Sequence, residues 1–513
     1  FLEDMLMFYA ARFFVGYDLL EARAFRITRD ADLYIDEEDA QDLVVEVERQ
    51  LKKRQRGQAV RLEFEVGTSR FMRRFMTQEM NLEKEDMYQI DGPLDMTVFF
   101  GFCGIKGYNH LRYPEAHPHS PWSMLELKRT PETNIFDMIR EKDLLIHLPY
   151  ESFDESVVNF LYSAANDKDV LAIKQTLYRV SSSSPVVQAL EKAVQNGKQV
   201  TVLMEVKARF DEANNILMAR RLEKAGAHVI YGLVGLKTHS KCTLVIRREK
   251  DGIRRYVHVA TGNYNASTAK LYTDLGILTC SDRFGIDASA FFNLLSGYSD
   301  PPIWDSFIVA PINLRQRCIE LIDREIHFAK NGEDAHMIAK MNSLLDKGII
   351  EKLYEASQAG VKIELIVRGI CVLIPGIPGV SDNITVRSIV GRFLEHSRIF
   401  WFRNGGREEL YVSSADWMPR NLNDRVELMV PIEDPEIKRR LKQMVDIELS
   451  DNQKAHIMQA DGTWLKTISA ENQLCAQEYF QKIAEKRDAE DEMTLAQKLE
   501  PYTPVLGHGD GSD

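Results

Sequence analysis

The sequence predicts an α/β fold (α+β overall), in which two tandem α/β domains follow part of a mixed α+β domain. The order of helices and strands that begins near residue 143 occurs again after about residue 306. In both stretches a helix that ends at a glycine, Gly197 or Gly360, comes just before an apolar strand. A short histidine motif follows late in each stretch. We therefore predict a partial mixed "head" domain at 1–125, a first α/β domain at 126–305 and a second one at 306–513.

The first 125 residues combine several patterns. An acidic cluster at 36–39 opens an amphipathic helical run that continues to Lys53. Alternating apolar residues from Val60 to Val66 predict a strand. Three prolines and three histidines within 108–121 are typical of an exposed loop.

The two later stretches have matching patterns. In the first, helices are predicted at 156–165, 186–195 and 213–225, and strands at 170–177, 200–206, 228–231, 242–246 and 256–260. In the second, helices are predicted at 318–330 and 349–359, and strands at 337–341, 361–367, 399–402 and 410–412. A large insertion at 370–389 separates the second histidine motif from Arg368. The tail after Leu499 is rich in Pro, Gly and Asp and is predicted to be disordered.

Each histidine motif places a histidine two residues before a cation. His239 precedes Lys241, and His396 precedes Arg398. Alternate strand residues share a face, so each imidazole is expected beside a fixed positive charge, and an anion between the two groups would relieve their repulsion. A single histidine on a strand is usually structural. Its occurrence at matched places in two repeats favours one composite anion site built from two halves.

Further cations lie in or after predicted strands. These residues are Lys174, Arg179, Lys207, Arg209 and Arg368. Ligands of open α/β sheets collect at the carboxyl ends of the strands. The arginine fork binds phosphate oxygens in pairs and lysine adds a point charge. These cations, together with the two histidine motifs, predict a site for a highly charged phosphate ligand.

The bulk composition limits the classes of function. The chain has 513 residues, a net charge of −12 and six scattered cysteines without zinc-ligand spacing. An acidic chain disfavours a generic nucleic-acid binder. The cysteine pattern, the absence of a signal peptide and the absence of a long apolar run predict a reducing, cytoplasmic setting. Since the chain starts at Phe1, we expect a piece of a longer protein.

Several long motifs carry a family resemblance. The segments 172–179 (AIKQTLYR), 205–212 (EVKARFDE), 261–265 (TGNYN) and 413–418 (SSADWM) resemble the bacterial polyphosphate kinases of the long, histidine-phosphorylated type. Leu394-Glu395-His396 and Arg368-Gly369 do so too. The resemblance covers nearly the whole chain to about residue 450. It implies that the two tandem domains are phospholipase D-like.

The resemblance implies an ATP:polyphosphate phosphotransferase that moves the γ-phosphate of ATP reversibly to inorganic polyphosphate. It implies that His239 becomes phosphorylated and that His396 is a second essential histidine that contacts the nucleotide phosphates or assists proton transfer. It also implies that Tyr272 and Arg368 contact ATP or ADP. We expect the cations of the local motifs to bind the same phosphates; they are Lys207, Lys241 and Arg398.

The family associates magnesium with the positions of Arg179 and Arg209. A guanidinium cannot ligate Mg²⁺, which prefers oxygen donors. We therefore expect these arginines to hold phosphate oxygens that carry the metal. The resemblance further implies a homo-oligomer (dimer or tetramer), with peripheral membrane association as an additional possibility.

Two departures from the family leave alternatives open. The resemblance starts partway into the family's second domain, so we expect the helical N-terminal domain, which contacts adenine, to be missing and the isolated chain to bind nucleotide weakly or to be inactive. A non-catalytic polyphosphate-binding fragment is therefore one alternative. The other is a phospholipase D-like phosphodiesterase, whose motif is His-x-Lys-x4-Asp. Ile246 and Arg403 stand at the two aspartate positions and disfavour it. P-loop and protein-kinase motifs are also missing.

Overall fold

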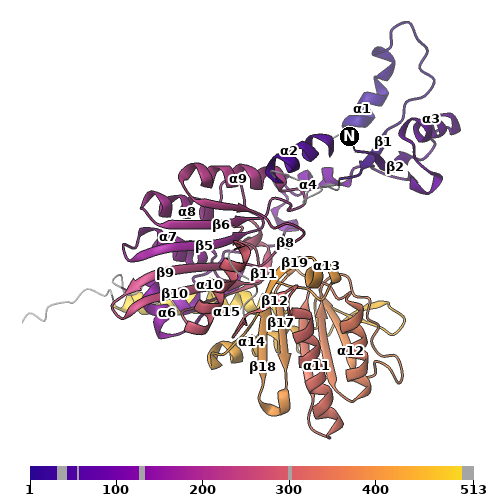
Figure 1. The fold of residues 1–513 in the computed structure, drawn as a ribbon. Helices are drawn as coiled ribbons and strands as arrows, with labels where there is room; N and C mark the ends of the chain where they lie inside the picture. The colour runs from indigo at the N-terminus through magenta and orange to yellow at the C-terminus, as the bar shows by residue number, and fades with distance from the viewer. Residues whose placement is uncertain (32–42, 55–56, 126–132, 298–302, 499–513) are drawn as a thin grey trace, which may run out of the picture. The chain divides into compact units, whose positions relative to one another are not determined.

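The computed structural model describes residues 1–31, 43–54, 57–125, 133–297 and 303–498, with side chains of the last helix described to residue 487. The chain forms two compact units, Phe1–Ala116 and His117–Asp513. The predicted acidic cluster at 36–39 and the predicted disordered tail lie outside the described residues. Both units combine helices and sheets (Figure 1).

The first unit contains a three-stranded sheet in the order β1-β2-β3. Its strands are β1 (Phe25–Arg29), β2 (Ala59–Glu65) and β3 (Met87–Ile90), and its α-helices are α1 (Leu2–Phe8), α2 (Leu43–Arg54), α3 (Arg70–Met80) and α4 (Phe99–Phe102). Leu62 and Phe64 on β2 pack with Met76 of α3 in a small core. The strand near 60–66 and the helical run to Lys53 are thus confirmed where the structure describes them.

The second unit begins with an eight-stranded sheet in the order β16-β11-β10-β9-β5-β6-β7, with β4 paired to β11. Its strands are β4 (Leu144–Leu148), β5 (Val170–Leu177), β6 (Gln199–Met204), β7 (His228–Tyr231), β9 (Cys242–Glu249), β10 (Gly252–Ala260), β11 (Tyr272–Thr279) and β16 (Leu394–Glu395). The accompanying helices are α6 (Ile135–Glu141), α7 (Asn159–Asn166), α8 (Pro185–Gln195), α9 (Glu212–Ala225) and α10 (Asp282–Leu295). The parallel strands β5, β6 and β7 are joined by α8 and α9.

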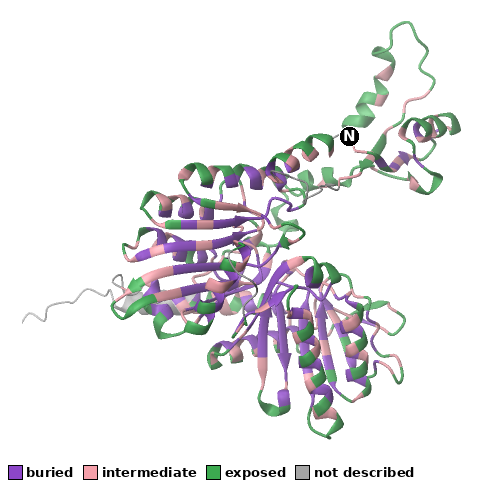
Figure 2. Ribbon diagram, in the orientation of Figure 1, coloured by how far each residue is buried: buried purple, intermediate pink, exposed green. Residues whose placement is uncertain are grey.

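The second half of this unit contains a ten-stranded sheet in the order β12-β19-β18-β17-β13-β14-β15-β20-β21, with β8 paired to β19. Its strands are β8 (Lys237–Thr238), β12 (Ile308–Ala310), β13 (His336–Met341), β14 (Lys362–Val367), β15 (Ile384–Ile389), β17 (Arg398–Phe402), β18 (Glu409–Ser413), β19 (Arg425–Pro431), β20 (Ala455–Met458) and β21 (Trp464–Lys466). The helices are α11 (Leu314–Lys330), α12 (Lys347–Gln358), α13 (Pro419–Asn423), α14 (Pro435–Leu449) and α15 (Ala476–Lys498). Helices α11 and α12 pack on the buried strands β13 and β14 (Figure 2).

The two halves repeat one topology. Strands β4, β11, β10, β9, β5, β6 and β7 of the first sheet have the same neighbours and directions as β12, β19, β18, β17, β13, β14 and β15 of the second. The predicted tandem α/β architecture is therefore confirmed. The insertion at 370–389 contains β15, a strand that the sequence pattern did not predict.

Each histidine motif crosses to the sheet of the other half. Strand β8, just before His239, pairs in parallel with β19 of the second half. Strand β16, just before His396, pairs in parallel with β11 of the first half. The prediction that the histidines lie within continuous strands was wrong, because residues 239–241 and 396–397 belong to no strand. The backbone N–H groups of His239 and Ser240 both donate to Val426 O at this crossing.

Candidate active site

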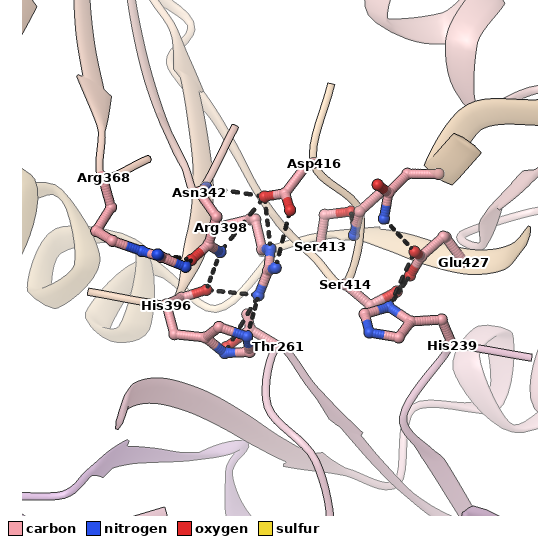
Figure 3. Close-up of polar contacts among 12 residues, drawn as sticks. His239, Thr261, Asn342, Arg368, His396, Arg398, Ser413, Ser414, Asp416 and Glu427 are labelled. Carbon is pink, nitrogen blue, oxygen red and sulfur yellow. Dashed lines mark hydrogen bonds and ion pairs between the residues drawn. The ribbon is translucent and has the colours of Figure 1, made fainter. Parts of the chain in front are cut away.

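His239 is held by a carboxylate from the other half. Its Nδ1 lies 2.9 Å from both carboxylate oxygens of Glu427 on β19. Glu427 also accepts hydrogen bonds from Ser414 Oγ and from Asn421 Nδ2. An ionised carboxylate only accepts, so Nδ1 carries the ring proton and Nε2 keeps a free lone pair. Lys241 Nζ lies 3.1 Å from Nδ1, beside the ring as the motif predicted (Figure 3 shows the His239–Glu427 contact).

His396 has the reciprocal arrangement. Its Nδ1 lies 2.9 Å from both carboxylate oxygens of Asp274 on β11 of the first half. Asp274 accepts a hydrogen bond of 2.6 Å from Thr261 Oγ1. Arg398 Nη1 lies 3.3 Å from each ring nitrogen. The ring of Tyr272 lies 5.1 Å from the imidazole. The predicted residues Tyr272, His396 and Arg398 are thus brought together.

The two hydroxyl–carboxylate pairs follow one spacing. Thr261 precedes Asp274 by 13 residues, and Ser414 precedes Glu427 by 13 residues. The segments that contain Thr261 and Ser414 carry the family resemblance, but no sequence motif pointed to the two carboxylates. The shared spacing after those segments was the available signal. In each half the pair serves the histidine of the opposite half, because β8 and β16 cross over.

Burial and neighbouring charges keep His239 neutral. Burial lowers the pKa of its imidazole well below 6.5, and Lys241, Arg425, Arg398 and His396 lower it further. The pKa of His239 is therefore lowered in part by Arg398 and His396 of the second histidine motif. In Figure 3 the His396 imidazole lies beside Arg398 and Thr261, and the His239 imidazole lies beside Glu427 and Ser414. A neutral imidazole at pH 7 is a competent nucleophile.

The other titratable groups are shifted for similar reasons. Burial lowers the pKa of Lys241 to about 7, although Glu427 opposes the shift. Burial raises the pKa of Glu427, and Lys241 and Arg425 oppose that change. Burial lowers the pKa of His396, partly offset by Asp274. Burial thus disfavours the charged forms of Lys241 and His396, and an added phosphate would stabilise these forms.

Arg368 is connected to His396 through one amide. Its Nε and Nη2 donate to Asn342 Oδ1 at 3.2 and 2.6 Å, and Asn342 Nδ2 donates to His396 O at 3.1 Å. Asp416 accepts from Asn342 N and pairs with Arg398 Nε at 3.1 Å. These bonds hold two guanidinium groups beside the second histidine (Figure 3).

The remaining predicted cations divide into two groups. Arg179 pairs with Asp211 at 2.8 Å and donates from Nη2 to Arg209 O at 3.1 Å, so these two positions lie together after β5 and β6. Tyr178, next to Arg179, places its ring 4.7 Å from His239. Lys207 is buried, and its Nζ donates to Leu233 O and Leu236 O, in the loop that leads into β8.

Lys174 lies elsewhere, because its Nζ contacts Asn293 Oδ1 of α10 at 3.4 Å. Arg425 is a cation that the sequence analysis missed. It starts β19, pairs in register with Lys237 and lowers the pKa of both His239 and Lys241. Its position corresponds to that of Tyr272, which pairs in the same way with Leu394.

The described residues contain no group of three or more His, Cys, Asp or Glu side chains that could hold a metal ion. Arginine nitrogens do not ligate Mg²⁺ either, so Arg179 and Arg209 fit the metal only through phosphate oxygens. In the same part of the chain, none of the helices is long and apolar enough to cross a membrane.

Fold and site together define a tandem α/β protein with a two-histidine, cation-rich site to which both halves contribute. Family models match three parts of the chain: the polyphosphate kinase middle domain at 1–102, C-terminal domain 1 at 134–301 and C-terminal domain 2 at 307–477. The chain belongs to the polyphosphate kinase family.

Individual relatives agree with this assignment. The polyphosphate kinase of Halalkalibacterium halodurans is 53% identical over 457 residues, which cover 88% of this chain and 64% of the relative. The polyphosphate kinase of Synechocystis sp. is 47% identical over 506 residues, which cover 94% of this chain and 68% of the relative. The crystal structure of polyphosphate kinase from Porphyromonas gingivalis matches with a TM-score of 0.82 at 32% identity, covering 96% of this chain and 71% of that chain. This chain thus spans about two thirds of the length of these relatives.

Proposed function

We propose that this chain carries the phosphotransfer site of an ATP:polyphosphate phosphotransferase. The observation that carries the proposal is the reciprocal pairing of the two histidines. Each Nδ1 is bound by a carboxylate of the opposite half, so each ring is oriented and the Nε2 of His239 is left available. The name of the matching relatives, polyphosphate kinase, supplies the substrate class.

In the first step, Nε2 of His239 attacks the γ-phosphorus of ATP. A P–N bond forms, the bond from γ-phosphorus to the β–γ bridging oxygen breaks, and ADP leaves with that electron pair. The ring then carries a positive charge, which Glu427 stabilises through the Nδ1–H bond. Transfer of a phosphoryl group spreads negative charge over its equatorial oxygens, so catalysis depends on position and nearby cations. Lys241, Arg398 and Arg368 supply these cations.

In the second step, a terminal oxygen of the polyphosphate chain attacks the phosphorus on His239. The P–N bond breaks, the ring returns to its neutral form and the chain grows by one phosphate. Two steps separate the two polyanions, so donor and acceptor need not be held against each other. His396 and Tyr272 hold the nucleotide phosphates in this scheme, with Lys207 supporting the loop that leads to the first motif. The reaction is reversible because each step exchanges a phosphoanhydride bond and the phosphoramidate bond of the phosphohistidine, both of which are high in energy.

Magnesium would enter with the nucleotide phosphates, whose oxygens Arg179 and Arg209 would hold. We also propose a homo-oligomer (dimer or tetramer), a cytoplasmic location and peripheral membrane contact, as the family resemblance implies. The six cysteines are free, which is consistent with a reducing compartment. Domain limits at 1–125, 126–305 and 306–513 belong to the same proposal.

The test is incubation of the chain with γ-³²P-labelled ATP and magnesium. We expect protein-bound label that is acid-labile and base-stable, as a phosphohistidine is. His239→Ala should abolish the label, whereas the control His327→Ala, on α11 away from the site, should keep it. Equal labelling of His239→Ala and the unmodified chain would contradict the assignment.

The same preparations separate the two alternatives. Hydrolysis of a phosphodiester without nucleotide would favour a phosphodiesterase. Against this alternative, the two aspartate positions of the phospholipase D motif hold Ile246, in β9, and Arg403, which is paired with Asp334 and Glu408. Binding of polyphosphate without any labelling would favour a non-catalytic fragment.

A further inference from the structure

The segment that leads to His396 is held by the first turn of α15. The side-chain amide of Gln477 bonds to the backbone of Phe393 in both directions, with N···Oε1 at 3.0 Å and Nε2···O at 2.9 Å. This pairing resembles that of a neighbouring β-strand. Its Nε2 also donates to Glu395 Oε1 at 2.6 Å. A Cβ at Gly391 would lie 2.4 Å from Gln477 Oε1, so a side chain there would displace the amide.

Glu395 joins this contact to a buried cluster of charges. Its carboxylate accepts from Lys340 Nζ at 2.7 Å and from Thr273 Oγ1 at 2.8 Å. Lys340 also pairs with Glu448 of α14. Lys340, Glu395 and Glu448 are each at least 96% buried, at 2%, 4% and 2% exposure. Burial opposes the charge of Lys340, but the two carboxylates outweigh it and raise its pKa, so Lys340 stays charged. Burial raises the pKa of Glu448 to about 7, although Lys340 opposes the shift.

The cluster is directly connected to the second histidine. Glu395 is the residue before His396, and Thr273 Oγ1 accepts from His396 N at 3.2 Å while it donates to Glu395. The next residue on β11, Asp274, binds the ring. The same few residues therefore fix both the backbone of His396 and the carboxylate that orients its imidazole.

A different buried carboxylate holds the first histidine motif: Glu205 accepts at 2.7 Å from the backbone N of Thr238, the residue before His239. Thr238 of β8 occupies the place of Glu395 and pairs with Val426, where Glu395 pairs with Thr273. The hydroxyl of Thr238 is buried without a hydrogen-bond partner in the structure. The segment before His396 is therefore held by Gln477 of α15, whereas the segment before His239 is held by Glu205.

We propose that Gln477, Lys340, Glu395 and Glu448 are positioning residues for His396, through which the start of α15 controls the placement of the second histidine but not of the first. The proposal rests on the proposed phosphotransfer function for its catalytic consequence. Its structural part is independent of that function. The helix start is itself fixed, because Ala476 N donates to Asp451 Oδ2 at 2.7 Å.

The test compares Gln477→Ala with Gln481→Ala, one turn later on the same helix. The first readout is the ¹⁵N NMR spectrum of protein labelled at its histidines. The ring signals of His396 and His239 are assigned by their loss in His396→Ala and His239→Ala. We expect Gln477→Ala to shift the His396 ring signals and to leave those of His239 in place. Gln481→Ala should change neither. Glu395→Gln provides a second variant of nearly the same shape, with the same expected pattern.

The second readout is steady-state kinetics. In Gln477→Ala, kcat should fall by roughly 10²-fold, the loss that a displacement of about 1 Å can cause. The KM for ATP should rise as well, because His396 holds the nucleotide phosphates in the proposed scheme. His396 ring signals that are unchanged in both Gln477→Ala and Glu395→Gln would overturn the proposal. Shifted His396 signals in a chain that forms no polyphosphate would support the positioning role and reject the phosphotransfer function instead.

Discussion

The Nδ1 atom of His239 lies 2.9 Å from Glu427, a residue 188 positions further along the chain and in the other half of the unit. His396 is bound in the same way by Asp274 of the first half, 122 positions earlier. Each carboxylate fixes the ring tautomer and leaves Nε2 for chemistry. The predictions below follow from this pairing and from the cations around it.

Replacement of Glu427 by glutamine should slow the labelling of His239. The amide keeps the shape but cannot stabilise a positive ring, and it can donate to Nδ1, which favours the wrong tautomer. We expect the rate of ³²P incorporation to fall by roughly 10²–10⁴-fold, the usual range for a positioned acid–base group. Glu433→Gln, an exposed residue paired with Arg283, is the control. A normal labelling rate in Glu427→Gln would remove this carboxylate from the mechanism.

Replacement of His396 by alanine should reduce turnover strongly and leave the fold intact. The side chain lies at a break between β16 and β17 and its removal empties no large core position. The expected fall in polyphosphate synthesis is again about 10²–10⁴-fold. His456→Ala, on β20, is the matched control. Synthesis at the unmodified rate in His396→Ala would show that the second histidine is dispensable.

Replacement of Arg368 by alanine should weaken nucleotide binding. The guanidinium is held by Asn342 beside His396, where it can bond to phosphate oxygens. Loss of a hydrogen bond to a charged group costs about 1–3 kcal/mol, and the dissociation constant measured by calorimetry should rise accordingly. Arg403→Ala removes an arginine that is paired with Asp334 and Glu408 and should leave the constant unchanged. Equal constants for Arg368→Ala and the unmodified chain would contradict a nucleotide contact.

Binding of phosphate ligands should weaken as the pH rises through 7. Burial lowers the pKa of Lys241 to about 7, so its charge is present below that pH and lost above it. A bound phosphate favours the charged form, so binding at higher pH must take up a proton. The affinity should then fall by at most about tenfold per pH unit for this one group. Calorimetry in buffers of different ionisation enthalpy measures the proton uptake, which Lys241→Arg should remove near pH 8.

Labelling of His239 should persist at mildly acidic pH. An ordinary histidine is half protonated near pH 6.5. Burial and nearby cations lower the pKa of His239 well below that value. Protonation removes the lone pair of Nε2, so labelling is lost only as the pH falls through this lower pKa. The initial rate of ³²P incorporation should therefore not fall between pH 7.5 and 6.5. A midpoint near 6.5 would show that the imidazole is not perturbed in this way.

Much of the architecture was predictable because strands and helices of the two repeats carry clear local signals. Strand β5 was predicted with its observed limits, the helix before Gly197 ends at the predicted residue, and the helix before Gly360 ends one residue earlier than predicted. Local patterns could not show that β8 and β16 pair with the opposite sheet, since their two-residue length carries no periodicity. The break at each histidine was missed for the same reason.

The candidate site was predictable in part. The motif spacing correctly placed Lys241 beside His239 and Arg398 beside His396. The carboxylates Asp274 and Glu427 were missed because their partners are distant in sequence and become neighbours only through the crossing strands. Lys174 was grouped with the site cations because its strand was correct, but its side chain turns to α10.

The reciprocal crossing of β8 and β16 has a consequence for how such a protein evolves. In a dimer of identical subunits, one codon change alters both copies of a half-site at the same moment. Here both half-sites are encoded in one chain, so a mutation changes only one of them. The equivalent positions have indeed diverged: Lys241 corresponds to Arg398, Glu427 to Asp274 and Arg425 to Tyr272. Duplication with reciprocal exchange thus permits division of labour, with one imidazole free to specialise as carrier and its twin as assistant.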